Sequence, residues 1–198
     1  MRRFIALLTL AFAALAAPAA AQAQHTASVV LAGGCFWCME PPYDKTDGVI
    51  STISGYSGGK TAKPTYEQVS SGSTGHIEVV KIEYDPAKVS FEKLLEVFWQ
   101  NIDPLDAAGQ FCDKGPQYRS AIFFGNEQEK ALAEASKQQI AGKLSQAVAT
   151  DILPAAEFYP AEDYHQDYYV KNPLKYKFYR YGCGRDARLE TVWGVAKK

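Results

Sequence analysis

The sequence has few residues of the kinds that build a structural metal site. Only three histidines occur among 198 residues, and His25, His76 and His165 lie far apart in the chain. A structural zinc ion generally takes two pairs of ligands, whereas this chain has a single Cys-x-x-Cys pair, Cys35 and Cys38. A zinc-binding or disulfide-stapled module is therefore disfavoured, and we expect no metal site.

The chain also lacks any excess of basic charge. Its formal net charge is −1, and it contains no run of Lys and Arg. Nucleic-acid-binding domains carry a clustered basic surface, so we expect no nucleic acid partner. The sequence shows no internal repeat, and its length suits one domain. A domain of this size buries about 70% of the surface that its unfolded chain exposes, so it needs no disulfide in order to fold.

A long apolar run occurs only at the start of the chain. Residues 1–3 are a short basic start, residues 4–17 are almost wholly apolar, and small residues follow as Ala19-x-Ala21 and Ala21-x-Ala23. This pattern is typical of a secretory signal peptide, and its apolar part is too short to span a membrane. The sequence predicts a signal peptide over 1–23, one domain over 24–198, and a periplasmic or secreted protein without membrane insertion after cleavage. A retained anchor helix is the alternative.

Hydrophobic periodicity and turn residues predict alternating strands and helices. Strands are expected over 28–32, 49–56, 76–84, 117–124 and 146–153, and helices over 35–44, 91–101, 126–142 and within 159–172. This order predicts an α+β fold, a two-layer α/β sandwich with a mixed sheet, a ferredoxin-like core and an irregular C-terminal tail from Tyr176. A doubly wound parallel sheet is the competing architecture. Pro41 and Pro42 are expected to kink or shorten the first helix, because neither has an amide donor.

Cys35 occupies the most informative position in the chain. It follows a buried strand and two glycines, Gly33 and Gly34, and it opens a helix. Unpaired amides and the helix dipole favour a negative charge there, so we expect a lowered pKa and a reactive thiolate. Glycines also let another molecule approach the backbone closely. The alternative, an inert buried thiol, needs neither feature.

The residues around Cys35 resemble one family. The segment Gly34-Cys35-Phe36-Trp37 is similar to the signature of type A peptide methionine sulfoxide reductases. Further similar blocks follow in family order at residues 55–59, 64–69, 74–80, 113–120 and 159–166. Together they span about 31–172, nearly all of the predicted mature chain. The resemblance implies reduction of methionine S-sulfoxide, free or in proteins, with formation of a sulfenic acid on Cys35.

Glu78 is the candidate acid. Residues 78, 80, 82 and 84 share one face of the predicted strand, and the other three are Val, Ile and Tyr. A carboxyl group on an apolar face is desolvated, so its pKa should rise and it can hold a proton. A solvated glutamate at a sheet edge is the alternative, and the resemblance favours the acid.

The remaining substrate-binding roles come from the resemblance alone. It implies that Tyr66 and Tyr118 bind the sulfoxide oxygen and that Asp113 holds water and the end of the substrate. Phe36 and Trp37 would enclose the methyl group, because an aromatic wall favours it over the oxygen. His165 could orient a neighbouring group, but we expect it to be a structurally hydrogen-bonded histidine.

A second thiol must close the catalytic cycle by forming a disulfide, which an external dithiol then reduces. Cys183 matches the tail position used by many family members and is the first choice, while Cys38, one helical turn from Cys35, is the second. Cys112 is expected to be a bystander. The resemblance implies a thioredoxin-like reductant, fed from across the inner membrane, and no bound cofactor. A Cys-x-x-Cys disulfide oxidoreductase is the alternative function, although Pro41 and Pro42 interrupt the long helix that usually carries that motif.

Overall fold

The structure is a computed structural model that describes residues 26–194. The predicted signal peptide over 1–23 lies outside these residues. One six-stranded sheet forms the centre of the molecule, with strand order β7-β6-β1-β3-β2-β8. Its strands are β1 Ala27–Gly33, β2 Val49–Ser57, β3 Ile77–Tyr84, β6 Ser120–Phe124, β7 Asp151–Pro154 and β8 Phe158–Pro160. The parallel pair β6 and β7 makes the sheet mixed, because the other pairs are antiparallel.

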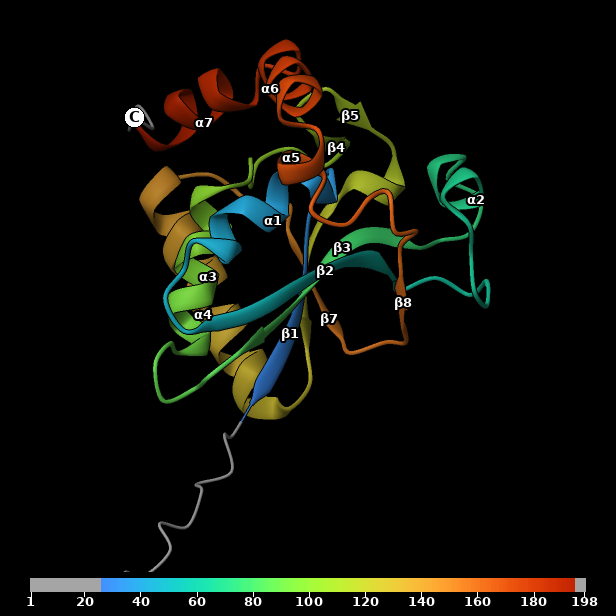
Figure 1. The fold of residues 1–198 in the computed structure, drawn as a ribbon. Coiled ribbons are helices and arrows are strands. Elements are labelled where there is room, and N and C mark those ends of the chain that lie inside the picture. Colours follow the sequence, from blue (N-terminus) through green and yellow to red (C-terminus); the bar gives the residue numbers. More distant parts are fainter. Residues whose placement is uncertain (1–25, 195–198) are drawn as a thin grey trace, which may run out of the picture.

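The inner four strands confirm the predicted ferredoxin-like core. Helix α1, Phe36–Asp44, connects β1 to β2, and helix α3, Phe91–Gln100, connects β3 to β6. The strands β6-β1-β3-β2 pair antiparallel throughout, which rules out a doubly wound parallel sheet. Helix α4, Glu127–Leu144, follows β6 and packs beside α3. The fold is therefore α+β, with helices over the sheet (Figure 1).

The main core lies between the sheet and these helices. The α3 side chains Leu94, Leu95 and Phe98 are fully buried there, as the amphipathic pattern predicts. Val80 and Ile82 of β3 contribute to the same cluster, so the face that begins at Glu78 points into the core. A smaller cluster on the opposite face of the sheet includes Ile77 and Val79. The alternation along β3 thus decides which side chains face the helices.

Of the two effects expected from the prolines of α1, a kink or a shortening, the shortening does not occur. The helix contains Pro41 and Pro42 and continues to Asp44. Each proline removes a helical hydrogen bond at a cost of about 3 kcal/mol or more. Burial of Phe36, Met39 and Tyr43 against the sheet offsets that cost, since burying each such side chain contributes about 1.5–3 kcal/mol. Tertiary packing therefore overrides the local signal.

The C-terminal tail is also not irregular, which corrects the sequence prediction. It forms α5 Tyr168–Lys171, α6 Pro173–Gly182 and α7 Arg185–Trp193. These helices lie beyond the end of the sheet at which α1 begins (Figure 1). The inward side of α6 carries tyrosine and arginine instead of aliphatic residues, so the sequence has no clear apolar period there.

The middle of the chain also differs from the predicted elements. Strand β8 was not predicted, and the strand expected over 117–124 is a 3-10 turn, Pro116–Tyr118, followed by β6. The strand expected over 146–153 is confined to β7, Asp151–Pro154. A short hairpin, β4 Gly109–Gln110 and β5 Asp113–Lys114, and the five-residue helix α2, Tyr66–Ser70, complete the elements that reach the site.

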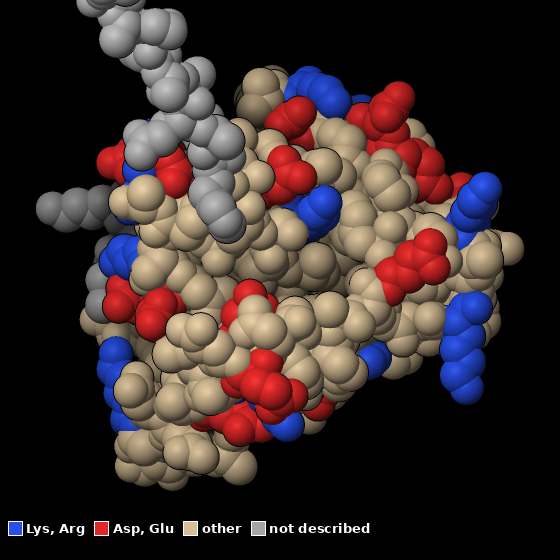
Figure 2. Space-filling model, turned by 90° about the horizontal axis from the view of Figure 1, so that it is seen from below, with Lys and Arg blue, Asp and Glu red and all other residues tan. Residues whose placement is uncertain are grey.

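The surface carries both signs of charge. Lys and Arg side chains are interspersed with Asp and Glu over the face seen from below, away from the C-terminal helices (Figure 2). This distribution agrees with the balanced formal charge of −1. Among residues 26–194 no helix is long and apolar enough to cross a bilayer.

Candidate active site

The turn between β1 and α1 positions Cys35. Gly34 has φ +79°, in the left-handed region that favours glycine, and Cys35 precedes the first helical residue. A Cβ on Gly34 would lie 2.5 Å from Cβ of Gln110, and one on Gly33 would lie 2.4 Å from Sδ of Met39. The glycines are therefore required so that the β4–β5 hairpin and α1 can close around the turn, which leaves Cys35 at the start of the helix.

Glu78 lies on the core face of β3, as the strand alternation predicted, and directly beside that turn. The backbone N–H of Phe36 donates to Oε2 of Glu78 over 3.1 Å, and both groups are buried. Burial, together with the charges of Asp113 and Cys38, raises the pKa of Glu78 to about 8 against the lowering effect of the Phe36 hydrogen bond. Glu78 therefore carries a proton at neutral pH.

The structure brings the expected site residues together around one small cavity of about 60 Å³. Its lining consists of Cys35, Phe36, Trp37, Tyr66, Glu78, Asp113, Tyr118 and Tyr179. These side chains come from α1, α2, β3, the hairpin, the 3-10 turn and α6. Two larger clefts, of about 370 and 510 Å³, lie between α3 and α4 and between α1 and α6, and neither is lined by a thiol. The small cavity is therefore the candidate active site.

Tyr179 is the one lining residue that the sequence analysis missed. Its hydroxyl donates to Oδ2 of Asp113 over 2.5 Å and lies within hydrogen-bond reach of Cys35. The chain has 12 tyrosines, and nothing in the sequence distinguishes this one. Only the position of α6 over the pocket places Tyr179 there.

Aromatic contacts fix the wall of the cavity. Nε1 of Trp37 donates to Nδ1 of His165 over 3.0 Å, and the Trp37 ring stacks on Tyr168 with 3.7 Å between ring centroids. The rings of Phe36 and His165 lie 4.9 Å apart. Burial lowers the pKa of His165, which favours the neutral ring that can accept from Trp37. His165 is therefore hydrogen-bonded within the wall, as expected, and through that bond it also orients Trp37.

The acidity of the two buried thiols differs from our expectation. Burial raises the pKa of Cys35 well above its ordinary value, and the neighbouring Cys38 and Glu78 raise it further. The prediction of a thiol acidified by the helix N-terminus is therefore wrong for the resting site, because the Phe36 amide donates to Glu78 instead. Cys38 is the acidic member of the pair. The hydrogen bond from Cys35 lowers the pKa of Cys38 to about 6 against the effect of burial, and the charges of Arg185 and Arg180 contribute.

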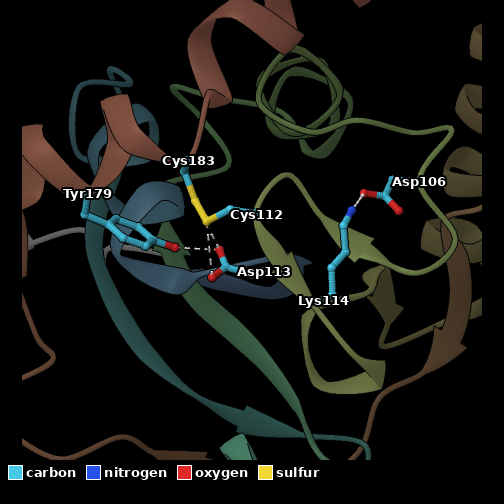
Figure 3. Close-up of a disulfide and its surroundings, with 6 residues drawn as sticks. All are labelled: Asp106, Cys112, Asp113, Lys114, Tyr179 and Cys183. Atoms are coloured by element: carbon cyan, nitrogen blue, oxygen red, sulfur yellow. Dashed lines mark hydrogen bonds and ion pairs between the residues drawn. A yellow bond between two sulfur atoms is a disulfide. The ribbon is translucent and has the colours of Figure 1, made fainter.

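The other two cysteines form a disulfide at the rim of the cavity. Cys112, in the turn of the β4–β5 hairpin, is bonded to Cys183, which follows α6. Their sulfur atoms lie 3.8 and 3.9 Å from the two carboxylate oxygens of Asp113, as Figure 3 shows. Cys112 is therefore not a bystander. The expectation failed because 71 residues separate the two cysteines and no local pattern joins them.

The disulfide also bears on metal binding. The ligand atoms of Cys112, Asp113 and Cys183 lie within 4.8 Å of one another, and no other group of three or more His, Cys, Asp or Glu residues lies this close together in the described part of the chain. Both sulfur atoms are consumed by the bond between them, and a metal ligand must be a free thiolate. In this oxidation state the group therefore offers a metal only the carboxylate of Asp113.

Arg185 introduces a buried positive charge behind the thiol pair. Its Nη2 donates to the carbonyl oxygens of Gly33 and Asn101, and its guanidinium lies 4.3 Å from the centroid of the Phe111 ring. Among the described residues it has no carboxylate in salt-bridge contact, although it is only 2% exposed. A buried cation without a paired anion is costly, so the anion that forms on Cys38 gains from it.

The comparisons with known proteins agree in family and in fold. A family model described as peptide methionine sulfoxide reductase matches residues 27–197. The chain is 53% identical over 167 residues to peptide methionine sulfoxide reductase MsrA of Halalkalibacterium halodurans, which covers 83% of this chain and 95% of that protein. It is 49% identical over 196 residues to MsrA 2 of Caulobacter vibrioides, covering 98% and 100%.

Solved structures give the same result. Methionine sulfoxide reductase A of Corynebacterium diphtheriae superposes with a TM-score of 0.72 at 37% identity, covering 75% of this chain and 76% of that one. The reduced form of Mxr1 from Saccharomyces cerevisiae superposes with a TM-score of 0.72 at 33% identity, covering 75% and 87%. Mxr1 has also been solved in complex with Trx2, and that likeness, at 23% identity, shows the fold alone.

The position of Arg185 predicts the acidity of the thiol pair. With the Cys112–Cys183 disulfide intact, only Cys35 and Cys38 can form thiolates, and ultraviolet absorbance should show the first one forming near pH 6. Arg185→Met removes the buried charge and should move this step to higher pH by about one unit or more. Arg188→Met, which removes a partly exposed arginine that pairs with the buried Asp103, is the control and should leave the pH of this step unchanged. If the first thiolate of Arg185→Met forms at the same pH as in the wild type, the charge of Arg185 does not act on Cys35 and Cys38.

Proposed function

The chain belongs to the peptide methionine sulfoxide reductase family, and we propose that Cys35 is the thiol with which it reduces methionine S-sulfoxide to methionine, free or in proteins. The observation that carries this assignment is the buried contact between the turn of Cys35 and the protonated carboxyl of Glu78. It places a soft nucleophile and a proton donor in one small cavity. Both groups are needed to break the bond between sulfur and oxygen.

The two raised pKa values define the first step. Glu78 gives its proton to the sulfoxide oxygen as the sulfur of Cys35 attacks the substrate sulfur. Cys35 gives its own proton to the thiolate of Cys38, to which it is hydrogen-bonded. The oxygen and the proton from Glu78 end on Cys35 as a sulfenic acid, and the thioether leaves. The substrate is reduced by two electrons, Cys35 is oxidised by two, and the negative charge moves from Cys38 to Glu78.

The other lining residues bind the two ends of the reacting group. Tyr66 and Tyr118 keep their protons, because burial raises the pKa of Tyr66 to about 12 and the pKa of Tyr118 as well. Both hydroxyls can therefore donate to the sulfoxide oxygen. Phe36 and Trp37 offer the aromatic wall against which the methyl group fits. Asp113, held by Tyr179, would bind water and the substrate backbone.

Cys38 is the better candidate for the second step than Cys183. Its side chain is hydrogen-bonded to Cys35, whereas Cys183 is bonded to Cys112. Attack of Cys38 on the sulfenic acid forms a Cys35–Cys38 disulfide and releases water, whose second proton comes from the Cys38 thiol. This assignment reverses the order expected from the sequence.

The Cys112–Cys183 pair then connects the site to the outside. When both are thiols they can reduce the Cys35–Cys38 disulfide by exchange and become the disulfide seen here. The structure corresponds to the state after that exchange, with the inner pair reduced and the outer pair oxidised. Cys112 is exposed, so an external dithiol such as thioredoxin can attack the outer bond, and the cycle needs no bound cofactor. The Trx2 complex of Mxr1 supports a partner of this class.

We further propose that the protein is exported to the periplasm or beyond. The basic start, the apolar run and the small residues before Ala23 support a signal peptide, as argued above. An oxidising compartment would also favour the outer disulfide.

Single-turnover stoichiometry tests the assignments of Cys35 and Cys38. With the outer disulfide intact and no reductant, the wild type should convert about one methionine sulfoxide residue per chain to methionine in a test peptide and end with a Cys35–Cys38 disulfide. Cys38→Ser should form a similar final amount of methionine, but more slowly because Cys35 loses its proton acceptor, and should stop at the sulfenic acid, which dimedone traps. Mass spectrometry measures the reduced peptide, the Cys35–Cys38 disulfide and the dimedone adduct. Formation of methionine by Cys35→Ser would refute the proposal, and a bond between Cys35 and Cys183 in the wild type would return the second step to Cys183.

The protonation of Glu78 predicts a fall in rate at alkaline pH. Its pKa is raised to about 8, so the acid is present below that pH and is lost as the pH rises through it. The single-turnover rate should therefore decline above about pH 8. Glu78→Gln should be slower by about 10²–10⁴-fold and should lack this decline. Glu83→Gln, on the same strand but half-exposed beside Lys81, is the control and should keep the wild-type profile. An alkaline decline that persists in Glu78→Gln would assign it to another group.

Export can be tested on the full chain expressed in a bacterium. The protein should appear in the periplasmic or extracellular fraction with an N-terminus at Gln22 or Gln24, which mass spectrometry identifies. Replacing Arg2 and Arg3 by Glu should retain uncleaved chain in the cytoplasm, because the basic start orients the signal. A wild-type chain that keeps residues 1–23 in the cytoplasm would contradict the proposal.

A further inference from the structure

Helix α6 exposes its most apolar side to solvent. Leu174, Phe178 and Tyr181 are 81%, 82% and 86% exposed, and their spacing of four and three residues puts them on one face of the helix. We call these three residues the α6 apolar face. The side that points inward carries Tyr176, Tyr179, Arg180 and, just after the helix, Cys183, which are all half-buried. The usual arrangement, with the apolar side against the core, is therefore inverted.

This face concentrates the exposed apolar surface of the described residues. Only three other large hydrophobic residues among them are exposed, and each is less exposed than these: Ile50, Tyr164 and Val170, at 48%, 55% and 61%. Val170 belongs to α5, which packs against α6. A contiguous exposed apolar patch generally marks an interaction site, since water otherwise opposes it.

The α6 apolar face leads directly to the outer disulfide. Tyr181 precedes Cys183 by two residues, and the bonded partner Cys112 is exposed. A protein dithiol that reduces this bond must place its attacking sulfur in line with one of the two sulfur atoms. Its surface then lies against α6.

We propose that the α6 apolar face is the docking surface for the protein dithiol that reduces the Cys112–Cys183 disulfide. This inference rests on the proposed cycle, in which that bond is the one opened from outside. The attacking thiolate of the partner forms a mixed disulfide with one cysteine, and the other leaves as a thiolate. The second partner thiol then attacks the mixed disulfide, so the partner ends oxidised by two electrons and both Cys112 and Cys183 end as thiols.

The charge around the face indicates what surrounds the apolar centre of the partner. Lys171, Lys175 and Lys177 are exposed beside it. Nζ of Lys171 donates to the carbonyl oxygen of Asp163, and within residues 26–194 neither of the other two has a carboxylate in ion-pair contact. The partner surface should therefore be apolar at its centre and acidic at its rim. A patch of three side chains also suits the small interfaces of transient redox encounters.

Comparing two reductants tests the proposal. The double variant Leu174→Ser, Phe178→Ser is assayed with dithiothreitol and with thioredoxin kept reduced by its reductase and NADPH. The KM for thioredoxin should rise at least tenfold, while turnover with dithiothreitol stays at the wild-type value, because a small dithiol needs no docking surface. Ile50→Ser, which removes an exposed apolar side chain elsewhere (48% exposed), is the matched control and should change neither. Lys175→Glu, Lys177→Glu should also raise the KM for thioredoxin, less so at high salt.

Each other outcome overturns the proposal. An unchanged KM for thioredoxin in the double variant means that the reductant docks elsewhere. Equal losses with both reductants mean that the residues support the fold of the tail and not an encounter. Two further outcomes apply if the thioredoxin kinetics are unchanged in the double variant. Binding of the wild type but not of the variant to anionic phospholipid vesicles would assign the face to a membrane. Loss of a wild-type dimer in the variant would assign it to a second copy of the chain. If the wild type fails to reduce sulfoxide with dithiothreitol, the proposed function fails instead, and reduction of the Cys112–Cys183 bond by thioredoxin still reports on docking.

Discussion

The arrangement of the site depends on one buried hydrogen bond, from the backbone N–H of Phe36 to the carboxyl of Glu78. It joins the first residue of α1 to the central strand β3, two elements separated by 42 residues in the chain. Without this bond, the Phe36 amide would be a buried donor without an acceptor, and the Glu78 carboxyl would lose a hydrogen-bond partner. Each loss costs about 1–3 kcal/mol. With it, the position of Cys35 is fixed relative to Glu78, because Cys35 precedes Phe36. The bond therefore sets the distance between nucleophile and acid.

The same burial creates a conflict that the site resolves with a second thiol. Removing Glu78 from water keeps it protonated, which suits an acid, but removing Cys35 from water also keeps its thiol protonated, which hinders a nucleophile. Cys38 resolves the conflict because its side chain is the acceptor for the Cys35 thiol and it lies near the charges of Arg185 and Arg180. A low-dielectric pocket can thus hold a strong proton donor and still deprotonate its nucleophile during attack. A single buried cysteine could not do both.

The sequence predicts the parts of the site that local rules govern. The alternation that places Glu78 on the core face is local, and the structure confirms it. The glycines before Cys35 are also a local signal, but Gln110 and Met39 of the same chain occupy the space beside them. Tyr66, Asp113 and Tyr118 could be placed only through the family resemblance, since nothing in their own segments distinguishes them. In α1 the two prolines do not shorten the helix, because Phe36 and Met39 bury enough surface to hold it.

The C-terminal helices show why the rest could not be predicted. A helix that covers a catalytic pocket must turn polar side chains inward, so α6 cannot be held in place by an apolar face. Specific bonds hold the tail instead. For α6 they include the hydrogen bond from Tyr179 to Asp113 and the disulfide from Cys183 to Cys112, and for α7 the hydrogen bonds of Arg185 to Gly33 and Asn101 and the bond from Nε1 of Trp193 to the carbonyl of Ile102.

Such attachments join residues about 70 to 150 positions apart, and no periodicity in the sequence reports them. They also link the tail to the chemistry. A disulfide that closes a long loop typically contributes about 2–4 kcal/mol. Reducing the Cys112–Cys183 bond therefore removes part of what holds Tyr179 over the pocket. The redox state of the outer pair and the position of the tail are therefore linked, because the same covalent bond carries the redox state and contributes to the attachment of the tail.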